Sequence, residues 1–326
     1  MYHFILNPKA SSGKGAKAWG KVEAILKKEG IAYEAHMLKS AKETVEFVEK
    51  LTTPDENCGG QEAAVSLEQG TLEGEEKVHI VVLGGDGTLN TVLNGIVDFE
   101  HTIISCIRTG SGNDFARNVG INKNVEKAIT HLLHTPKKMC LDYGIASYET
   151  EEKKESRRFI ISSGVGYDAD ICEEVGRSNL KKILNRIGLG KLVYVMIGIK
   201  QIFTRVNAGA TVYIDEERME IPNLFFVVGM IHEMEGGGVP FCPKADPTDG
   251  LLDVCLVKQM SRFKLLLAVL MVYVKQHYRF RNITAYRCRK LRVKPTEPQW
   301  FHMDGETPDK IVGLELESCN GLHFYM

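Results

Sequence analysis

A continuous apolar run that ends in a glycine-rich turn near residue 84 constrains the fold of this chain most. Residues 78–83 (VHIVVL) have the character of a strand buried on both faces, as in a parallel sheet. A helical pattern follows over 88–97. Glycines let a ligand approach the backbone, and the N–H groups at a helix start attract anions. The pattern therefore predicts a phosphate-binding turn made of Gly84, Gly85, Asp86, Gly87, Thr88, Leu89 and Asn90.

The carboxylate inside this turn needs its own explanation. Asp86 would repel a phosphate unless a cation lay between them, so we interpret it as a residue linked to Mg²⁺ or to a polar network. The turn is not the dinucleotide fingerprint, because the third glycine of that motif would fall at Asn90. Nor is Gly13-Lys14 a Walker P-loop, since Pro8 stands where its first glycine is required. A turn built only for packing would explain two glycines but not Asp86.

Strands and helices alternate through the first third of the chain. The expected strands are 2–6, 31–37, 78–83 and 102–107, and the expected helices are 16–28, 41–51 and 88–97. This alternation predicts a parallel sheet with helices on both faces. Loops at 7–14 and 109–117 (TGSGNDFAR) follow two of the strands, so they would reach the same carboxyl edge as the turn at 84–90. Three such loops at one edge indicate a nucleotide site.

Past about residue 137 the pattern becomes rich in strands. The expected strands are 139–147, 158–163, 210–215, 223–231, 251–257, 283–288 and 291–294, with helices at 191–204 and 262–277. We therefore predict an α/β domain with a parallel, Rossmann-like sheet over 1–137 and a mainly antiparallel β-sandwich domain over 138–310. The last segment, 311–326, is expected to pack back onto the first domain.

Charge is distributed unevenly. The net charge is −1, yet residues 43–76 hold ten acids and one base, a balance of −9 that leaves +8 elsewhere. We interpret 53–76 as a solvated surface insertion, with a regulatory or partner-binding segment as the alternative. The segments 177–191 and 279–294 contain bases and no acid, so each is either a contact for anionic lipid headgroups or a solvated face. No stacking platform or recognition helix accompanies them, and we expect no nucleic-acid partner.

The cellular compartment follows from what the sequence does not contain. The eight cysteines form no C-x-x-C pair, which favours free thiols in a reducing cytosol. No run reaches the roughly 18 uninterrupted apolar residues that span a bilayer. We expect a cytoplasmic protein that visits the inner face of the membrane transiently.

Five motifs occur in an order that gives the chain a family resemblance. They are NPxAxSGK at 7–14, GGDGTLNxVLNG at 84–95, TGSGNDFAR at 109–117, GGG…PxA…DGLLDV within 236–254, and DGE at 304–306. The chain resembles the diacylglycerol kinase catalytic-domain family, specifically bacterial lipid kinases akin to diacylglycerol kinase and phosphatidylglycerol kinase-like enzymes. The resemblance covers nearly the full length. It implies a first domain of the NAD kinase and diacylglycerol kinase type, and transfer of the γ-phosphate of Mg·ATP to a hydroxyl of diacylglycerol or a related lipid at the membrane surface.

The resemblance also implies roles for individual residues. Glu306 would accept the proton of the lipid hydroxyl, and Lys14, Asp86 and Asp249 would form a catalytic polar network around the nucleotide and the metal. A bound Mg²⁺ would be held by Asp246, Asp249 and the backbone carbonyl of Leu251. Asp114 would support its loop. The ATP contacts would come from Asn7, Ser12, Gly13, Lys14, Ser40, Gly84, Gly85, Asp86, Gly87, Thr88, Leu89, Asn90, Thr109, Gly110 and Ser111.

The sequence departs from the family pattern at two places and leaves alternatives open. Arg108 stands where the family usually has proline, and an asparagine often found before the triple glycine is missing from 228–235. The residues alone favour a hairpin turn at 304–306, between strands at 300–303 and 311–317, and only the ordered motifs favour a base at Glu306. The alternatives are an NAD kinase-like phosphotransferase, which shares GGDGT, and a silent nucleotide- or lipid-binding module. Neither the lipid nor the oligomeric state, a homodimer included, is specified by the sequence.

Overall fold

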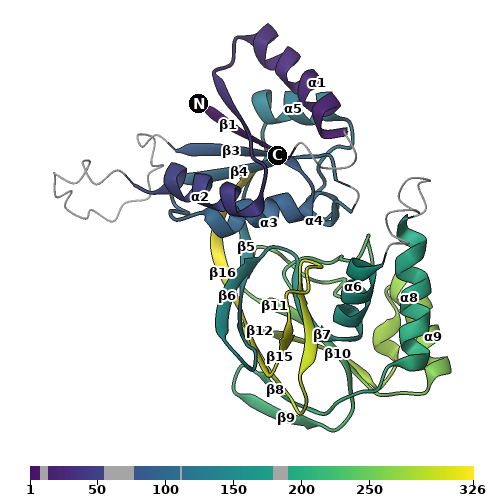
Figure 1. The fold of residues 1–326 in the computed structure, drawn as a ribbon. Helices are drawn as coiled ribbons and strands as arrows, with labels where there is room; N and C mark the ends of the chain where they lie inside the picture. Colours follow the sequence, from purple (N-terminus) through teal and green to yellow (C-terminus); the bar gives the residue numbers. More distant parts are fainter. Residues whose placement is uncertain (8–13, 55–76, 111, 179–189) are drawn as a thin grey trace. The chain divides into compact units, whose positions relative to one another are not determined.

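The computed structural model describes residues 1–7, 14–54, 77–110, 112–178 and 190–326 (Figure 1). The chain forms two compact units. The first consists of Met1–Ser111, Ile121–Leu141 and Gly321–Met326, and the second of Gly112–Gly120 and Asp142–Asn320. Residues 55–76 of the expected insertion and most of the basic segment 177–191 lie outside the described residues. Across the described residues, none of the helices combines the length and the apolar character that a membrane span requires.

The first unit is built on a parallel sheet. Its strand order is β2 (Tyr33–Met37), β1 (Tyr2–Leu6), β3 (Val78–Gly84) and β4 (Thr102–Arg108), and the end of β16 (Gly313–Tyr325) adds a further parallel strand beside β4. Figure 1 shows α1 (Lys14–Glu29) and α5 (Val125–His134) on one face, and α2 (Ala41–Thr52) and α3 (Asp86–Gly95) on the other. The predicted parallel sheet with helices on both faces is confirmed.

Burial on both faces explains the apolar run in β3. Val81 and Leu83 pack in one cluster with Trp19 of α1 and Ile129 of α5. Val82, which points to the opposite face, is equally buried. A strand that is covered on both faces has apolar residues at successive positions and does not alternate between apolar and polar ones. The run at 78–83 therefore indicates a strand although it lacks a period of two.

The second unit is an antiparallel β-sandwich. One sheet has the order β12 (Ile283–Cys288), β11 (Leu252–Lys258), β10 (Leu224–Met230), β7 (Ser162–Gly166), β14 (Gln299–Met303) and β15 (Lys310–Ile311). The other contains β16, β13 (Lys290–Pro295), β8 (Ala210–Ile214) and β9 (Glu217–Ile221), with β5 (Lys138–Glu149) paired to β16 and β6 (Lys154–Phe159) to β5. A core shared by both sheets includes Val227, Val254 and Leu291, all fully buried. The predicted antiparallel sandwich is confirmed.

Three helices cover the outer face of the six-stranded sheet. They are α6 (Tyr167–Arg177), α8 (Gly190–Thr204) and α9 (Arg262–Tyr273), which lie beside β7 and β10 in Figure 1. Ile202 of α8 and Leu265 of α9 pack against Phe226 and Val228 of β10 in a second apolar cluster. These helices therefore bury the face of the sheet that points away from the sandwich core.

Several element boundaries differ from the sequence expectation for identifiable reasons. The strand expected at 158–163 spans the end of β6 and the start of β7. The helix expected at 262–277 ends at Tyr273, because Lys275 takes a left-handed backbone with a φ of 57°. The helix α4 (Asp114–Asn118) begins within the loop expected at 109–117, whereas α5, α6 and the strand β9 were not expected from the sequence.

Candidate functional site

Three loops of the first unit meet at the carboxyl edge of its sheet. Thr109, directly after β4, donates its backbone N–H to the carbonyl of Gly84 at 2.9 Å. Asn7, directly after β1, donates its side-chain amide to Thr88 Oγ1 at 3.4 Å. The ends of β1, β3 and β4 are thus joined by hydrogen bonds, and the sequence motifs they carry lie together.

Glycine is required where two of these loops touch. A Cβ on Gly85 would lie 3.0 Å from the Cα of Gly110, and a Cβ on Gly84 would overlap the side chain of Thr88. Gly85 is also the N-cap of α3 and has no side chain with which to occupy the first N–H groups of the helix. A helix start that lacks a side-chain cap suits a bound anion, because its first N–H groups need acceptors.

The expected nucleotide contacts have different surroundings. Thr109 is buried, and its Oγ1 has no hydrogen-bond partner among the described residues. Asn90 is buried in α3, where its Oδ1 accepts from Asn94 at 3.1 Å. Ser40 caps α2, with Oγ accepting from the N–H of Glu43 at 3.2 Å. The expected contacts at Ser12, Gly13 and Ser111, and the side chain of Lys14, lie outside the described residues.

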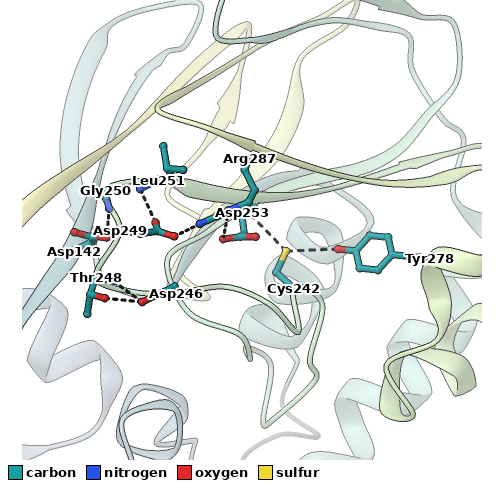
Figure 2. A network of polar contacts seen from close by, with 10 residues as sticks. All are labelled: Asp142, Cys242, Asp246, Thr248, Asp249, Gly250, Leu251, Asp253, Tyr278 and Arg287. Atoms are coloured by element: carbon teal, nitrogen blue, oxygen red, sulfur yellow. Dashed lines mark hydrogen bonds and ion pairs between the residues drawn. The ribbon is translucent and has the colours of Figure 1, made fainter.

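In the second unit, a loop before β11 carries the residues expected to bind metal (Figure 2). Asp246 Oδ1 accepts from the N–H and the hydroxyl of Thr248, at 3.1 and 2.7 Å. Asp249 accepts from the N–H of Leu251 at 3.0 Å, and its other oxygen forms an ion pair with Arg287. The carboxylates that the sequence singles out therefore shape the loop itself.

Two further aspartates, which sequence reasoning did not select, complete this acidic cluster. Asp142 Oδ2 accepts from the N–H of Gly250 at 2.7 Å, while its Oδ1 accepts no hydrogen bond from the described residues. The Oδ2 of Asp253 lies 3.6 Å from Arg287 Nε and forms an ion pair with it. Burial, together with the charge of Asp246, raises the pKa of Asp253 to about 6. Burial also raises the pKa of Asp142, against the effect of the Gly250 hydrogen bond.

Arg287 offsets part of the negative charge of this cluster, because it pairs with both Asp249 and Asp253. Carboxylate oxygens are the ligands that a hard divalent cation prefers, so the loop could accept such an ion.

The residues Asp304-Gly305-Glu306 form the turn between β14 and β15. Asp304 accepts backbone N–H groups from Ile160, Ile161 and Ser162 at 2.9, 2.8 and 3.1 Å. Left-handed φ values of 48° at Asp304 and 82° at Gly305 reverse the chain. The Glu306 side chain is 54% exposed and pairs with Arg157 at 3.4 Å. The turn is therefore a hairpin that also presents a carboxylate to solvent.

A buried polar network lies behind this turn. His302 Nε2 and Asp168 Oδ2 are 3.0 Å apart, and Ser162 donates its hydroxyl to Glu235. All four residues are buried. Burial lowers the pKa of His302, but Asp168, with help from Glu235 and Asp304, outweighs it and raises the pKa to about 9. Burial raises the pKa of Glu235 to about 7, although His302 opposes this rise.

Sequence reasoning missed this network because its members are far apart in the chain. The one signal was position, since His302 stands two residues before Asp304 and Glu235 stands directly before the triple glycine. Ser162 ties the network to the turn, because its N–H binds Asp304 while its hydroxyl binds Glu235.

Asp114 connects its own loop to the triple glycine. It accepts the N–H of Gly237 at 2.7 Å and pairs with Arg117. The three glycines have φ values of 58°, 90° and 105°, in the region that disfavours side chains. A Cβ on Gly238 would also lie 3.1 Å from Arg117 Nη1. The motif thus needs glycine for backbone shape and for the approach of the arginine.

Comparisons with known proteins agree with this two-part organisation. Residues 1–141 match the family model described as the diacylglycerol kinase catalytic domain. Residues 161–314 match the model described as the YegS C-terminal NAD kinase beta sandwich-like domain. Together the two models account for most of the chain, one for each compact unit.

Curated relatives and solved structures extend the likeness. YtlR of Bacillus subtilis, which is provisionally named a lipid kinase, is 21% identical over 94% of this chain and 93% of its own. Diacylglycerol kinase of the same organism is 23% identical over 76% of this chain and 77% of its own. A crystal structure from Bacillus anthracis, provisionally named a diacylglycerol kinase, has a TM-score of 0.73 at 18% identity and covers 99% of this chain and 96% of that one. At such identity the structural likeness establishes the fold alone.

The His302 network predicts how stability depends on pH. The folded chain raises the pKa of His302 from 6.5 to about 9. The proton therefore stabilises the folded state below about pH 6.5, and this contribution is lost as the pH rises through about 9. We expect the free energy of unfolding to fall over that interval, and to fall less in His302→Gln, which cannot bind the proton. Urea denaturation at a series of pH values measures both slopes.

His131→Gln, a change at an exposed histidine of α5, serves as the control and should keep the wild-type slope. Parallel pH profiles for wild type and His302→Gln would contradict the assignment, even if the variant were less stable throughout.

Proposed function

Because this chain belongs to the diacylglycerol kinase catalytic-domain family, we propose that it is an ATP-dependent lipid kinase. In this proposal the γ-phosphate of Mg·ATP passes to a hydroxyl of diacylglycerol or a related lipid. The observation that carries the proposal is the meeting of three loops at the carboxyl edge of the parallel sheet, where open α/β sheets bind their ligands. The comparisons with lipid kinases support the choice of acceptor class.

ATP would bind at this edge through the turn that begins at Gly84. The backbone N–H groups at the start of α3 would receive phosphate oxygens, since Gly85 leaves them uncapped by a side chain. The buried hydroxyl of Thr109 would bind the nucleotide, because it has no partner among the described residues. Asp86 and Lys14 would complete the polar network around the phosphates.

The metal would be Mg²⁺, held by the carboxylates of Asp246 and Asp249 and the carbonyl of Leu251. Asp142 and Asp253 belong to the same acidic cluster, and a bound cation would lower their raised pKa values. Asp253 also pairs with Arg287, so the ion would share this carboxylate with the guanidinium. When bound, the ion supplies positive charge that phosphoryl transfer requires.

Glu306 would act as the general base. Its carboxylate takes the proton of the lipid hydroxyl as the hydroxyl oxygen forms a bond to the γ-phosphorus and the bond to the β-phosphate oxygen breaks, which releases ADP. Asp304 fixes the turn through three backbone N–H groups, so the exposed carboxylate of Glu306 is held on a rigid base. Because the acceptor is a bilayer lipid, we further propose that the enzyme works at the cytoplasmic face of the membrane.

A phosphate-transfer assay tests the reaction itself. Purified protein with Mg²⁺ and γ-labelled ATP is offered diacylglycerol, phosphatidylglycerol, a sphingoid base and NAD, and the products are identified by mass. We expect label in at least one lipid and none in NAD. Transfer to NAD alone, or to no lipid of the panel, would contradict the proposal.

The unpaired hydroxyl of Thr109 predicts a selective loss of ATP binding. Thr109→Val removes one hydrogen bond, worth about 0.5–1.5 kcal/mol, so the Kd for ATP should rise roughly twofold to thirteenfold. The free energy of unfolding should stay the same or increase, because no bond within the described residues is lost. Isothermal titration calorimetry and urea denaturation measure the two effects.

Thr102→Val is the matched control. Thr102 begins β4, at the opposite end of the strand, and its Oγ1 is also buried and unpartnered within the described part of the chain. The control should leave the affinity for ATP unchanged. Equal weakening in both variants would show that the effect comes from the strand and not from a nucleotide contact.

The role of Glu306 predicts a loss of turnover without a loss of nucleotide binding. Glu306→Gln should lower kcat by about 10²- to 10⁴-fold, since an amide cannot accept the proton. The lost pair with Arg157 is exposed and should cost less than about 1 kcal/mol of stability. Glu297→Gln, at an exposed glutamate of the same unit, should keep wild-type kcat. If the kcat of Glu306→Gln stayed within about twofold of the kcat of Glu297→Gln, Glu306 would be excluded as the base.

A further inference from the structure

Exposed apolar side chains are concentrated on two helices of the second unit. The described residues include fourteen large hydrophobic residues with exposed side chains, and eleven of them lie on α8, on α9 or directly after these helices. They are Val195, Met196, Ile199, Phe203, Val206, Phe263, Leu267, Val269, Leu270, Tyr273 and Val274. A gathering of this size on a protein surface marks an interaction site.

Helix α9 is apolar on two opposite sides. Leu265, Ala268 and Val272 are buried against the sheet. Phe263, Leu267, Leu270 and Val274 follow one another at steps of four, three and four residues, so they form a second stripe along the helix. Phe263 is 77% exposed and Leu270 66%. Packing among the described residues of the second unit therefore accounts for one stripe and leaves the other exposed.

Helix α8 repeats the arrangement beside it. Val193 and Ile197 are buried, while Met196, Ile199 and Phe203 form an exposed stripe at steps of three and four. The helices are in contact, and they lie side by side in Figure 1. The guanidinium of Arg262 at the start of α9 lies 6.0 Å from the ring centre of Phe203 near the end of α8. The two stripes thus form one surface, which we call the α8–α9 face.

Basic residues lie on α8 and α9 and in the segment that follows α9. Residues 190–206 and 261–282 contain no aspartate or glutamate. Lys200 and Lys275 form ion pairs with Glu174 and Glu233. The remaining exposed bases form no ion pair with any residue that the structure describes; they are Arg262, Lys264, Arg279 and Arg281.

We propose that the α8–α9 face docks onto a lipid bilayer that contains anionic lipids. Its apolar side chains enter the boundary between headgroups and acyl chains, and the bases around it bind lipid phosphates. This inference rests on the proposed lipid kinase function, since an enzyme that phosphorylates a bilayer lipid must meet the bilayer surface. The proposed reaction requires a contact between the enzyme and the bilayer but does not say where it lies. The inference places that contact on α8 and α9.

Charge favours a bilayer over a second copy of this chain. A twofold contact through the α8–α9 face would set the same surface against itself. Bases such as Arg262 and Lys264 would then meet bases, with no acid on either helix to offset them. Anionic headgroups supply the complementary charge.

The face also differs from the basic segments that the sequence drew attention to. Most of the second segment, 279–294, lies in the sandwich strands β12 and β13. Arg287 pairs with Asp249, and Lys290 with Glu315 and Glu317. Only Arg279 and Arg281 of that segment lie close in sequence to α9.

Vesicle co-sedimentation of the full chain tests the proposal. The vesicles are phosphatidylcholine alone or with phosphatidylglycerol, and binding is measured without ATP. We expect tighter binding to the anionic vesicles. The double variant Phe263→Ser/Leu270→Ser should weaken binding at least about tenfold, because two apolar side chains no longer enter the bilayer. The double variant Met37→Ser/Val97→Ser removes two exposed apolar side chains from the first unit and should bind as wild type.

A second variant protects the test against misfolding. Lys264→Gln changes one exposed charge and should reduce the preference for anionic vesicles without altering the thermal unfolding curve. Equal vesicle binding by the helix double variant and its control would overturn the proposal. So would a wild-type dimer in sedimentation velocity that Phe263→Ser/Leu270→Ser dissociates, because the face would then be an interface between copies.

A soluble acceptor separates this proposal from the proposed function. Short-chain dioctanoylglycerol, dispersed without vesicles, should be phosphorylated equally by wild type and Phe263→Ser/Leu270→Ser. If the wild type phosphorylated this lipid but bound no vesicles, the proposed kinase function would stand and the proposed docking of the α8–α9 face would be excluded. If the wild type bound vesicles through the α8–α9 face but phosphorylated no lipid, the proposed docking would stand and the proposed kinase function would be excluded.

Discussion

Backbone N–H groups bound by aspartate carboxylates hold the functional loops of the second unit in place. Asp304 binds three N–H groups at the start of β7 and just before it, Asp114 binds Gly237, and Asp142 binds Gly250. Each bond joins segments more than a hundred residues apart in the chain. A carboxylate that accepts N–H groups makes stronger hydrogen bonds than a neutral acceptor. The motif aspartates at 114 and 304 are therefore anchors in this structure, and Glu306 in the turn at 304–306 is the carboxylate that we propose as the base.

The same dependence on charge extends into the core. His302, Asp168 and Glu235 are ionisable and buried together, an arrangement whose desolvation cost is offset only when each charge is paired. Ser162 belongs to both systems, since it binds Glu235 through its hydroxyl and Asp304 through its N–H. The protonation of the network is thereby linked to the segment that supports the turn at 304–306. If Glu235 were apolar, the hydroxyl of Ser162 would lose this partner, and the turn at 304–306 would lose its link to the network.

Much of the fold could be predicted because its signals are local. The run at 78–83 and the turn after it specify a strand and a helix, and the shared edge of parallel strands brings the loops of residues 7, 84 and 109 together without knowledge of any contact. The network of His302 could not be predicted, because its partners are joined only by the folded sandwich. Ser40, which the family resemblance implies as a nucleotide contact, caps α2 in the structure, and its contact with a nucleotide stays a prediction.

Helices α8 and α9 show a further limit of sequence patterns. Periodicity predicts both helices, but a sequence with two apolar stripes does not tell which stripe faces the core. In α9, Leu265, Ala268 and Val272 pack against the sheet. Phe263 and Leu270 are equally apolar but lie on the opposite side of the helix, so they are exposed. Net charge is equally uninformative here. The value of −1 for the whole chain averages an acidic segment with stretches such as 261–282 that contain no acid, and a surface attracts its partner through the charges within about 10 Å of it.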